Sequence, residues 1–304
     1  MEFKHYSVML SEAIEGLDIK PDGVYADLTL GGSGHSKEIA KRLTTGKLIA
    51  VDKDTDALNV GRQRLEGYNV EFIHSDFKDV IPTLPKVDGI LMDLGVSSYQ
   101  IDNPERGFSY RNDGELDMRM DLTAPLTAKN VVNEYEEGEI ADILFRYGEE
   151  RYARKIAQNI VKERQQSPIT TTSRLAEIIE KSIPPKERFK GGHPARRSFQ
   201  AIRIEVNGEL AGLYESVLSA IDRLNKGGRL CIITFHSLED RAVKQAMRYA
   251  ELDCICPPQS PICTCNKVKE VKCITKKPIL PSKEELAENK RSESAKLRIA
   301  EKLI

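Results

Sequence analysis

The sequence predicts an α/β fold, in which a largely parallel sheet carries an inserted all-helical domain. Three observations indicate this fold. Short apolar runs alternate with helix-like segments in both end regions, three glycines follow the first such run, and a long middle stretch shows helical spacing without strand-like runs. We expect the α/β domain to comprise residues 1–104 and 207–304, and the helical insertion to comprise residues 105–206.

Composition sets broad limits on the protein. The 304 residues are 40% hydrophobic and 31% charged, which is typical of a globular chain with one large or two modest domains. The chain has no run of 18 apolar residues and no basic-then-apolar leader, so we expect a cytoplasmic protein without a membrane span. Because the formal net charge is only −1, contact with nucleic acid requires a local basic patch.

The first strand-like run stops at a cluster of glycines. Apolar residues alternate through 24–30, as in a buried strand, and helical spacing begins at Ser36. Gly31, Gly32 and Gly34 allow a tight turn there and let a ligand approach the backbone. An ordinary glycine-rich turn is the alternative. The N-terminal segment before this run is one candidate to cover a ligand cleft, with His5 interpreted as a surface or capping residue.

An acidic residue ends the next apolar run, 47–52. Asp52 lies 21 residues after Gly31, close to the spacing at which a carboxylate binds ribose hydroxyls. A surface turn is the alternative, because Lys53 and Asp54 follow. Together, the glycines and Asp52 indicate a nucleotide-like ligand.

The same loop narrows the choice of ligand. Lys37 stands where a dinucleotide fold has its third glycine, which disfavours NAD. Gly34-His35-Ser36 lacks the lysine of an ATP-binding phosphate loop. An adenosine-containing ligand without a pyrophosphate remains, and S-adenosylmethionine is the common one.

Further strands are expected at 70–74 and 87–95, with a helix at 55–65 between the second and third strands. Ligands of open α/β sheets bind beyond the carboxyl ends of the strands. We expect one crevice to collect the residues at or near such ends: Asp27, Asp52, Phe77 and Asp93. For Phe77, stacking on adenine and closing the hydrophobic core both remain open.

From Val96 the strand pattern breaks into a polar, turn-rich stretch. Tyr99, Phe108 and Tyr110 are interleaved in it and argue against disorder, so we interpret it as a substrate-facing loop. Helical spacing follows through 140–182. Residues 181–203 then hold seven Lys or Arg against one Glu, a composition that suits a phosphate backbone, although a solvated helix face is the alternative.

The strand pattern resumes near the C-terminus. A helix at 209–224, a turn at Gly227-Gly228 and a strand at 229–235 are expected, with short final strands at 268–274 and 297–301. His236 ends the strand at 229–235 and borders the expected crevice, while residues 237–240 are expected to cap the next helix. A purely structural role for this histidine is the alternative.

Four cysteines cluster in the last part of the chain: Cys254, Cys256, Cys263 and Cys265. They could form a tetrahedral zinc site, yet Cys-x-Cys is not the usual Cys-x2-Cys spacing. Reduced or variably oxidised surface thiols are the alternative. We therefore assign no metal ligand from the sequence.

Several longer blocks carry a family resemblance. In order, they are Asp27-x-Thr29-x-Gly31-Gly32-x-Gly34-His35-Ser36, Asp93-Leu94-Gly95-Val96-Ser97-Ser98, Arg106-Gly107-Phe108, Leu116-Asp117-Met118-Arg119-Met120-Asp121, Tyr147-Gly148-Glu149-Glu150, Ser198-Phe199-Gln200-Ala201-Ile202-Arg203-Ile204 and Phe235-His236-Ser237-Leu238-Glu239-Asp240-Arg241. Over nearly its whole length the chain closely resembles the bacterial small-subunit ribosomal RNA cytosine-N4 methyltransferase family.

The resemblance implies a class I S-adenosylmethionine-dependent methyltransferase (Rossmann-like) sheet. It also implies S-adenosylmethionine as the methyl donor, and as acceptor a cytidine in the decoding centre (P site) of 16S ribosomal RNA in the small ribosomal subunit. Carried over by position, the cofactor contacts fall on Ser33, Gly34, His35, Asp52, Phe77, Asp93 and Gln100. Many family members have glycine at the position of Ser33, a change we expect to be tolerated if the position does not need a positive φ.

The acceptor amine is a weak nucleophile, so we expect catalysis to depend mainly on alignment. Asp93 is the proposed polar anchor and His236 a weaker catalytic candidate; the two prolines common after this strand in amino-methyltransferases are absent. The substrate candidates are Ser97, Tyr99, Phe108, Tyr110, Arg196 and Arg197, the rings stacking on a base turned out of its helix. The rival functions are an NAD-dependent oxidoreductase and a non-catalytic RNA-binding assembly factor, and a homodimer is one open assembly.

Overall fold

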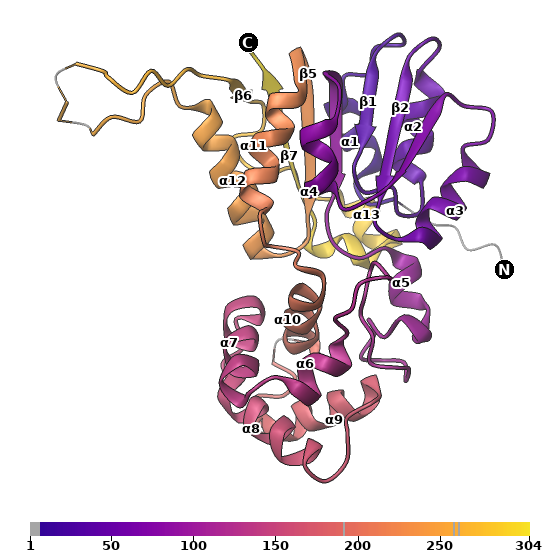
Figure 1. The fold of residues 1–304 in the computed structure, drawn as a ribbon, viewed down its shortest axis with the longest axis vertical. Helices are drawn as coiled ribbons and strands as arrows, with labels where there is room; N and C mark the ends of the chain where they lie inside the picture. The colour runs from indigo at the N-terminus through magenta and orange to yellow at the C-terminus, as the bar shows by residue number, and fades with distance from the viewer. Residues whose placement is uncertain (1–6, 191, 258, 261) are drawn as a thin grey trace. The chain divides into compact units, whose positions relative to one another are not determined.

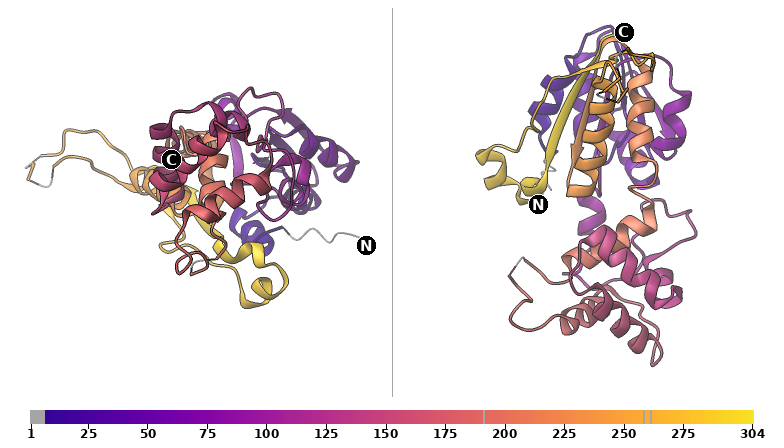
Figure 2. Two further views of the ribbon diagram at one scale, coloured as in Figure 1. Left: turned by 90° about the horizontal axis from the view of Figure 1, so that it is seen from below. Right: turned by 90° about the vertical axis from the view of Figure 1, so that its left-hand side faces the viewer.

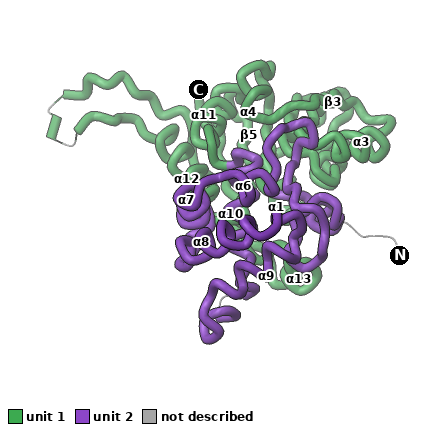
Figure 3. Tube along the Cα trace, turned by 60° about the horizontal axis from the view of Figure 1, so that its bottom comes forward, with its two compact units in different colours: residues 1–95, 210–304 green, residues 96–209 purple. Residues whose placement is uncertain are grey.

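The computed structural model describes residues 7–190, 192–257, 259–260 and 262–304, so His5 lies outside the described residues. The chain divides into two compact units, Met1–Gly95 with Leu210–Ile304 and Val96–Glu209 (Figure 3). The predicted boundaries are 105 and 206. That the second unit recognises substrate stays a prediction.

The first unit is built on a seven-stranded sheet of order β3-β2-β1-β4-β5-β7-β6. Strands β1 to β5 pair in parallel, whereas β7 is antiparallel to both β5 and β6. The strands are β1 Val24–Asp27, β2 Lys47–Asp52, β3 Val70–His74, β4 Val87–Asp93, β5 Leu224–Thr234, β6 Val271–Cys273 and β7 Lys296–Lys302. Apart from the antiparallel β7, which lies between β5 and β6, this is the 3-2-1-4-5-6 order of dinucleotide-binding sheets. The predicted α/β sheet is therefore confirmed.

Helices cover both faces of this sheet (Figures 1 and 2). Alternate residues of each strand enter two different cores: Ala26 and Ile49 pack with α11 and α12, while Tyr25 and Leu48 pack with α1, α2 and α3. This period of two is the pattern of a sheet buried on both faces. The helices of this unit are α1 Leu10–Leu17, α2 Gly34–Arg42, α3 Thr55–Arg64, α4 Phe77–Val80, η1 Ile81–Thr83, α11 Leu213–Arg223, α12 Ser237–Glu251, α13 Lys283–Glu288 and η3 Lys290–Ser294.

The second unit is helical and has a core of its own. Its helices are α5 Ser98–Asp102, η2 Pro104–Arg106, α6 Ala128–Glu134, α7 Glu137–Gly148, α8 Ala153–Arg164, α9 Thr172–Ser182 and α10 Arg196–Asn207. The apolar faces of α7, α8 and α10 supply fully buried side chains such as Leu144, Ile156 and Ile202. Among the described residues, no helix of either unit has the length and apolar character needed to cross a membrane.

The strand expected at 229–235 begins five residues earlier, at Leu224. The expected turn at Gly227-Gly228 lies inside β5, which starts at Leu224. Leu224 pairs with Val87 before the register shifts between Val87 and Gly89. Gly227 has a φ of +78°, so the irregularity is absorbed within the strand, and polar residues 225–226 gave no strand signal in the sequence.

Candidate active site

The glycine turn and the acid at the end of β2 are joined directly. The backbone N–H of Gly31 donates to Asp52 Oδ2 at 2.8 Å, and the N–H of Asp54 donates to Asp52 Oδ1 at 2.8 Å. Removal of the carboxyl from water raises the pKa of Asp52 to about 6, although these two N–H donors lower it in part. Both carboxylate oxygens are therefore held in place at the carboxyl edge of the sheet, and each retains a further lone pair for a ligand.

Helix α2 starts in the same turn. Ser33, its N-cap residue, has a φ of +64°, and its buried hydroxyl makes no hydrogen bond. Position 33 therefore does have the positive φ that glycine adopts most readily, and the condition we set for tolerating serine is not met. Next to it, a Cβ on Gly34 would lie 1.8 Å from Ser7 Oγ and 3.1 Å from Ser7 Cβ, so a side chain here would require Ser7 to move.

The N-terminal segment packs on the start of α2. His35 is buried, and its Nε2 lies 3.0 Å from the carbonyl oxygen of Val8. Burial lowers the pKa of His35 to about 4, so the imidazole is neutral near pH 7. The segment that we considered as a cover for the ligand cleft thus contacts the predicted cofactor residues Gly34 and His35.

Asp52, Asp27 and Asp93 are the last residues of β2, β1 and β4, three strands that are adjacent in the sheet. Asp27 accepts hydrogen bonds from Ser36 Oγ at 2.7 Å and from the N–H of Thr29 at 3.2 Å. Burial raises the pKa of Asp27 to about 6, with these hydrogen bonds opposing the shift.

Asp93 is the least satisfied of the three. Its Oδ2 lies 3.7 Å from His35 Nδ1, too far for a hydrogen bond, and its buried Oδ1 has no hydrogen-bond partner. Burial raises the pKa of Asp93 well above its ordinary value, and the nearby charges of Asp27, Glu239 and Glu285 raise it further. An unpartnered buried acceptor costs free energy unless something binds it, so Asp93 favours a ligand with a donor group at this point.

The charge of this edge discriminates between ligands. The hydrogen bonds to Asp27 and Asp52 described above come from neutral N–H and O–H groups, so the carboxylates present negative charge to a ligand. The sulfonium and ammonium groups of S-adenosylmethionine are cationic and suit such a site. NAD-binding sheets also carry an acid at the position of Asp52, so a preference for a cationic ligand rests on Asp27 and Asp93.

The surroundings of Phe77 fit both roles that the sequence left open, stacking on adenine and closing the hydrophobic core. It is the first residue of α4, after the N-cap Asp76, and its half-buried ring packs against the core shared by β2 and β4. Lys78 Nζ lies 5.9 Å from the centroid of the ring. Part of the ring thus closes the core while part stays accessible.

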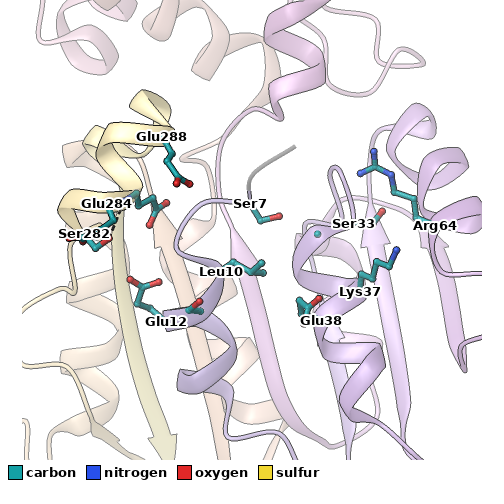
Figure 4. A pocket seen from close by; sticks show the side chains of 13 residues that line it. Ser7, Leu10, Glu12, Ser33, Lys37, Glu38, Arg64, Ser282, Glu284 and Glu288 are labelled. Atoms are coloured by element: carbon teal, nitrogen blue, oxygen red, sulfur yellow. Dashed lines mark hydrogen bonds between the residues drawn. The ribbon is translucent and has the colours of Figure 1, made fainter. Parts of the chain in front are cut away.

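A groove of about 820 Å³ lies on another side of the glycine turn (Figure 4). It shares Ser33 and Gly34 with the predicted cofactor residues. Its other walls are Ser7, the start of α1, α2, Arg64 at the end of α3, and the region of α13. Its acidic side chains are Glu12, Glu38, Glu284, Glu285 and Glu288. Asp27, Asp52 and Asp93 are not among its lining residues, so it overlaps the predicted cofactor residues only at the glycine turn.

His236 has a defined structural role. It is the N-cap of α12, one residue before the predicted cap: its Nδ1 accepts from the N–H of Glu239 at 3.3 Å. Glu239 Oε2 in turn accepts from the N–H groups of Phe235 and His236 at 2.8 and 3.2 Å, and its Oε1 lies 3.0 Å from His236 Nε2. The sequence predicted a cap within 237–240 because Ser237 and Asp240 have the spacing of a capping box. A catalytic role for His236 stays a prediction.

Substrate candidates at the start of the helical unit differ in accessibility. Ser97 forms a capping box at α5 with Gln100, which was predicted as a cofactor contact; each side chain accepts from the other's backbone N–H. Tyr99, between them, is 49% exposed. Phe108 lies in the core of the unit, which favours a packing role for its ring. Tyr110 stacks on His193 with ring centroids 4.4 Å apart.

The basic stretch 181–203 is partly neutralised within its own unit. Lys181 pairs with Glu177, Lys190 with Glu187, and Arg203 with Glu209. Arg196 and Arg197 are exposed at the start of α10, where Arg197 Nη1 donates to the carbonyl oxygen of Glu149 at 3.3 Å. The number of cations available to phosphate is therefore smaller than the composition indicates.

Three contributors to the site were not among the predicted site residues. Thr29 Oγ1 accepts from the N–H of Asp93 at 2.6 Å and so links β1 to β4, and Ser36 holds Asp27. Thr29 and Ser36 both lie in the sequence motif that runs from Asp27 to Ser36, so their position in that motif could have indicated a role in the site. Glu285 raises the pKa of Asp93 from a distant part of the chain, which no local pattern could indicate.

Comparison with known proteins identifies the family. The family model described as the MraW methylase family matches residues 2–303. The chain belongs to this family. The ribosomal RNA small subunit methyltransferase H of Finegoldia magna is 53% identical over 312 residues, and that of Clostridium botulinum strain Kyoto is 56% identical over 310 residues, each covering 100% of both chains.

Membership in the MraW methylase family makes the chain a methyltransferase with S-adenosylmethionine as methyl donor. The predicted family, class I fold, enzyme class and cofactor are thereby confirmed. An rRNA methylase structure from Streptococcus thermophilus is 12% identical, with a TM-score of 0.40 and coverage of 97% and 94% of the two chains. That likeness is too weak to add to the topology described above.

Proposed function

We propose that this chain methylates the exocyclic N4 amine of a cytidine in the decoding centre (P site) of 16S ribosomal RNA, within the small ribosomal subunit. Relatives that match along the full chain are named ribosomal RNA small subunit methyltransferase H, which supports ribosomal RNA as the substrate. The observation that carries the chemistry is Asp93, whose buried Oδ1 has no hydrogen-bond partner at the end of β4.

S-adenosylmethionine supplies the electrophilic methyl group. Asp52 is suited to accept hydrogen bonds from its ribose hydroxyls, since its two oxygens are already oriented by Gly31 and Asp54. Ser33, Gly34 and His35 form the start of α2 beside it, and the accessible part of the Phe77 ring suits an adenine. The negative charge of Asp27 and Asp93 offsets the positive charge of the donor.

The proposed role of Asp93 is to accept a hydrogen bond from the cytosine amine. Such a bond fixes the orientation of a nitrogen whose lone pair is delocalised into the ring, and alignment is the main resource available for this reaction. The carboxylate must be ionised to act only as an acceptor. Since burial and neighbouring acids raise the pKa of Asp93, a cation bound nearby is needed to favour the ionised form.

On the RNA side, the exposed ring of Tyr99 is the most accessible of the predicted stacking residues. Arg196 and Arg197 are proposed to contact phosphates, since both are exposed at the first turn of α10. These assignments, a homodimer and a cytoplasmic location remain predictions.

Incubation with donor labelled in the methyl group tests the proposal, using naked 16S RNA and assembled small subunits that lack the modification. We expect label in N4-methylcytidine after nuclease digestion and mass spectrometry of the nucleosides, mapped to one position. Label in another nucleoside would contradict the proposed acceptor. RNA binding without any transfer would favour the assembly-factor alternative, and thermal stabilisation by NAD but not by S-adenosylhomocysteine would favour the oxidoreductase.

A further inference from the structure

The loop between α12 and β6 brings together four thiols that are not among the predicted site residues. It projects from the first unit in Figure 1 and carries Cys254, Cys256, Cys263 and Cys265. All four Sγ atoms lie within 4.8 Å of one another. Cys273, which follows in β6, is not part of this group, because its Sγ contacts the carbonyl oxygen of Met247 at 3.7 Å.

The spacing of the sulfurs is that of a single tetrahedral ion. A zinc–sulfur bond is about 2.3 Å long, so the sulfurs of a regular ZnS4 tetrahedron lie about 3.8 Å apart. Here the distances are 3.5 Å for Cys254–Cys263 and Cys263–Cys265, 3.8 Å for Cys254–Cys265 and 3.9 Å for Cys256–Cys263. Two disulfides would instead give two distances near 2.0 Å.

Backbone N–H groups point at the same sulfurs. The N–H of Ile255 lies 3.3 Å from Cys265 Sγ, that of Cys256 lies 3.3 Å from Cys254 Sγ, and that of Thr264 lies 3.4 Å from Cys256 Sγ. Such donors stabilise thiolates that bind a metal and orient them toward it. The two Cys-x-Cys pairs thus supply both the ligands and their supporting hydrogen bonds.

We propose that these four cysteines bind one Zn²⁺ ion with a structural role. Four thiolates fill a tetrahedral coordination sphere and leave no open position for water or substrate, so the ion has no direct part in catalysis. The cysteines are exposed or half-buried, and Ile255 and Ile262 beside them are 48% and 74% exposed. The described residues of the loop therefore form no hydrophobic core, and the ion substitutes for one.

Metal content of the full-length protein, purified under reducing conditions from zinc-supplemented cells, tests this inference. We expect about one zinc per chain by inductively coupled plasma mass spectrometry. Cys254→Ser/Cys265→Ser should lose the zinc, whereas the control Cys273→Ser, at a half-buried cysteine outside the group, should retain it. Both variants should still bind S-adenosylhomocysteine, because no predicted cofactor residue lies in the loop.

A second measurement covers the case in which the variant fails to fold. Cobalt-substituted wild-type protein should show the visible bands of a tetrahedral tetrathiolate, and limited proteolysis within 252–270 should accelerate after chelation. Reduced protein without bound metal, iron in place of zinc, or two disulfides within the loop of freshly purified protein would each overturn the assignment.

Discussion

Gly31 and Asp52 lie 21 residues apart, and the backbone N–H of Gly31 donates a 2.8 Å hydrogen bond to Asp52 Oδ2. The bond joins the two sequence features from which we predicted a nucleotide-like ligand. It also couples the turn before α2 to the end of β2, so that a change at Asp52 alters the shape of the glycine turn.

Asp52→Asn should therefore weaken cofactor binding through two effects. The amide removes a charged acceptor for the ribose hydroxyls, and its nitrogen cannot accept from Gly31 or Asp54. Hydrogen bonds to charged groups contribute about 1.5–3 kcal/mol, so we expect the Kd for S-adenosylhomocysteine to rise by about 10- to 100-fold. Isothermal titration calorimetry measures it, with exposed Asp79→Asn as the control. Similar affinities for both variants would rule out this role.

Ser33→Gly should stabilise the protein. Ser33 has a φ of +64° and a buried hydroxyl without a hydrogen-bond partner. Glycine adopts this conformation without the steric cost, so the free energy of unfolding should rise by about 1 kcal/mol. Urea unfolding measures the change. Ser33→Ala is the control, because it removes the hydroxyl but keeps the Cβ; if alanine stabilises as much as glycine, the backbone is not the cause.

The strands of this fold were predictable, whereas the conformations of single site residues were not. The runs 47–52 and 70–74 became β2 and β3 with the same bounds, because the spacing of apolar residues along a strand is local in sequence. The φ of Ser33 depends on the angle at which α2 leaves the sheet, and the cap at His236 depends on Glu239 folding back. Neither has a distinctive residue pattern.

Charge in the site was also beyond prediction from sequence. The aspartates at the strand ends were identified, but the raised pKa of Asp93 depends on burial and on Glu239 and Glu285, which come from distant segments. Likewise, the basic composition of 181–203 did not show that Lys181 and Arg203 pair with glutamates. Pairing depends on helix geometry and on residues outside the stretch.

Asp27→Asn should change how stability depends on pH. The pKa of Asp27 is about 6 in the folded protein against 3.8 ordinarily, so the carboxyl is protonated in both states below pH 3.8. As the pH rises from 3.8 to 6, the carboxyl ionises in the unfolded state while burial opposes its ionisation in the folded state. The folded protein therefore loses up to about 3 kcal/mol of stability, at about 1.4 kcal/mol for each pKa unit. The variant should gain stability over wild type across this window. Chemical unfolding at several pH values measures it.

Asparagine keeps the size of Asp27 and an oxygen to accept from the N–H of Thr29, but its amide nitrogen donates toward Ser36 Oγ where the carboxylate accepted. The hydrogen-bond change is the same at every pH, so the pH-dependent part of the difference reports the charge. Exposed Asp22→Asn serves as the control, for which we expect no such gain. A difference between Asp27→Asn and wild type that stays constant from low to neutral pH would show that Asp27 ionises freely in the folded protein.

Cofactor affinity should depend on pH in a way that reflects ligand charge. As the pH falls through about 6, Asp27 and Asp52 become protonated and the site loses negative charge. Binding of S-adenosylmethionine should weaken by about tenfold from about pH 8 to about pH 5. S-adenosylhomocysteine lacks the sulfonium charge and should weaken less. Equal pH dependence for the two ligands, measured by calorimetry, would argue against the carboxylates as the partners of the sulfonium.

Arg197→Gln should weaken RNA binding in a salt-dependent manner. Arg197 is exposed at the start of α10, where a phosphate would also interact favourably with the helix dipole. Losing one phosphate contact lowers the slope of log Kd against log salt concentration by about 1. Filter binding of a 16S RNA fragment at several KCl concentrations measures this slope.

Lys181→Gln is the matched control from the same basic stretch, because the Lys181 ammonium is paired with Glu177 and should contribute little to the slope. If the two substitutions lower the slope equally, the stretch acts through its total charge, and the position of Arg197 on α10 has no special importance.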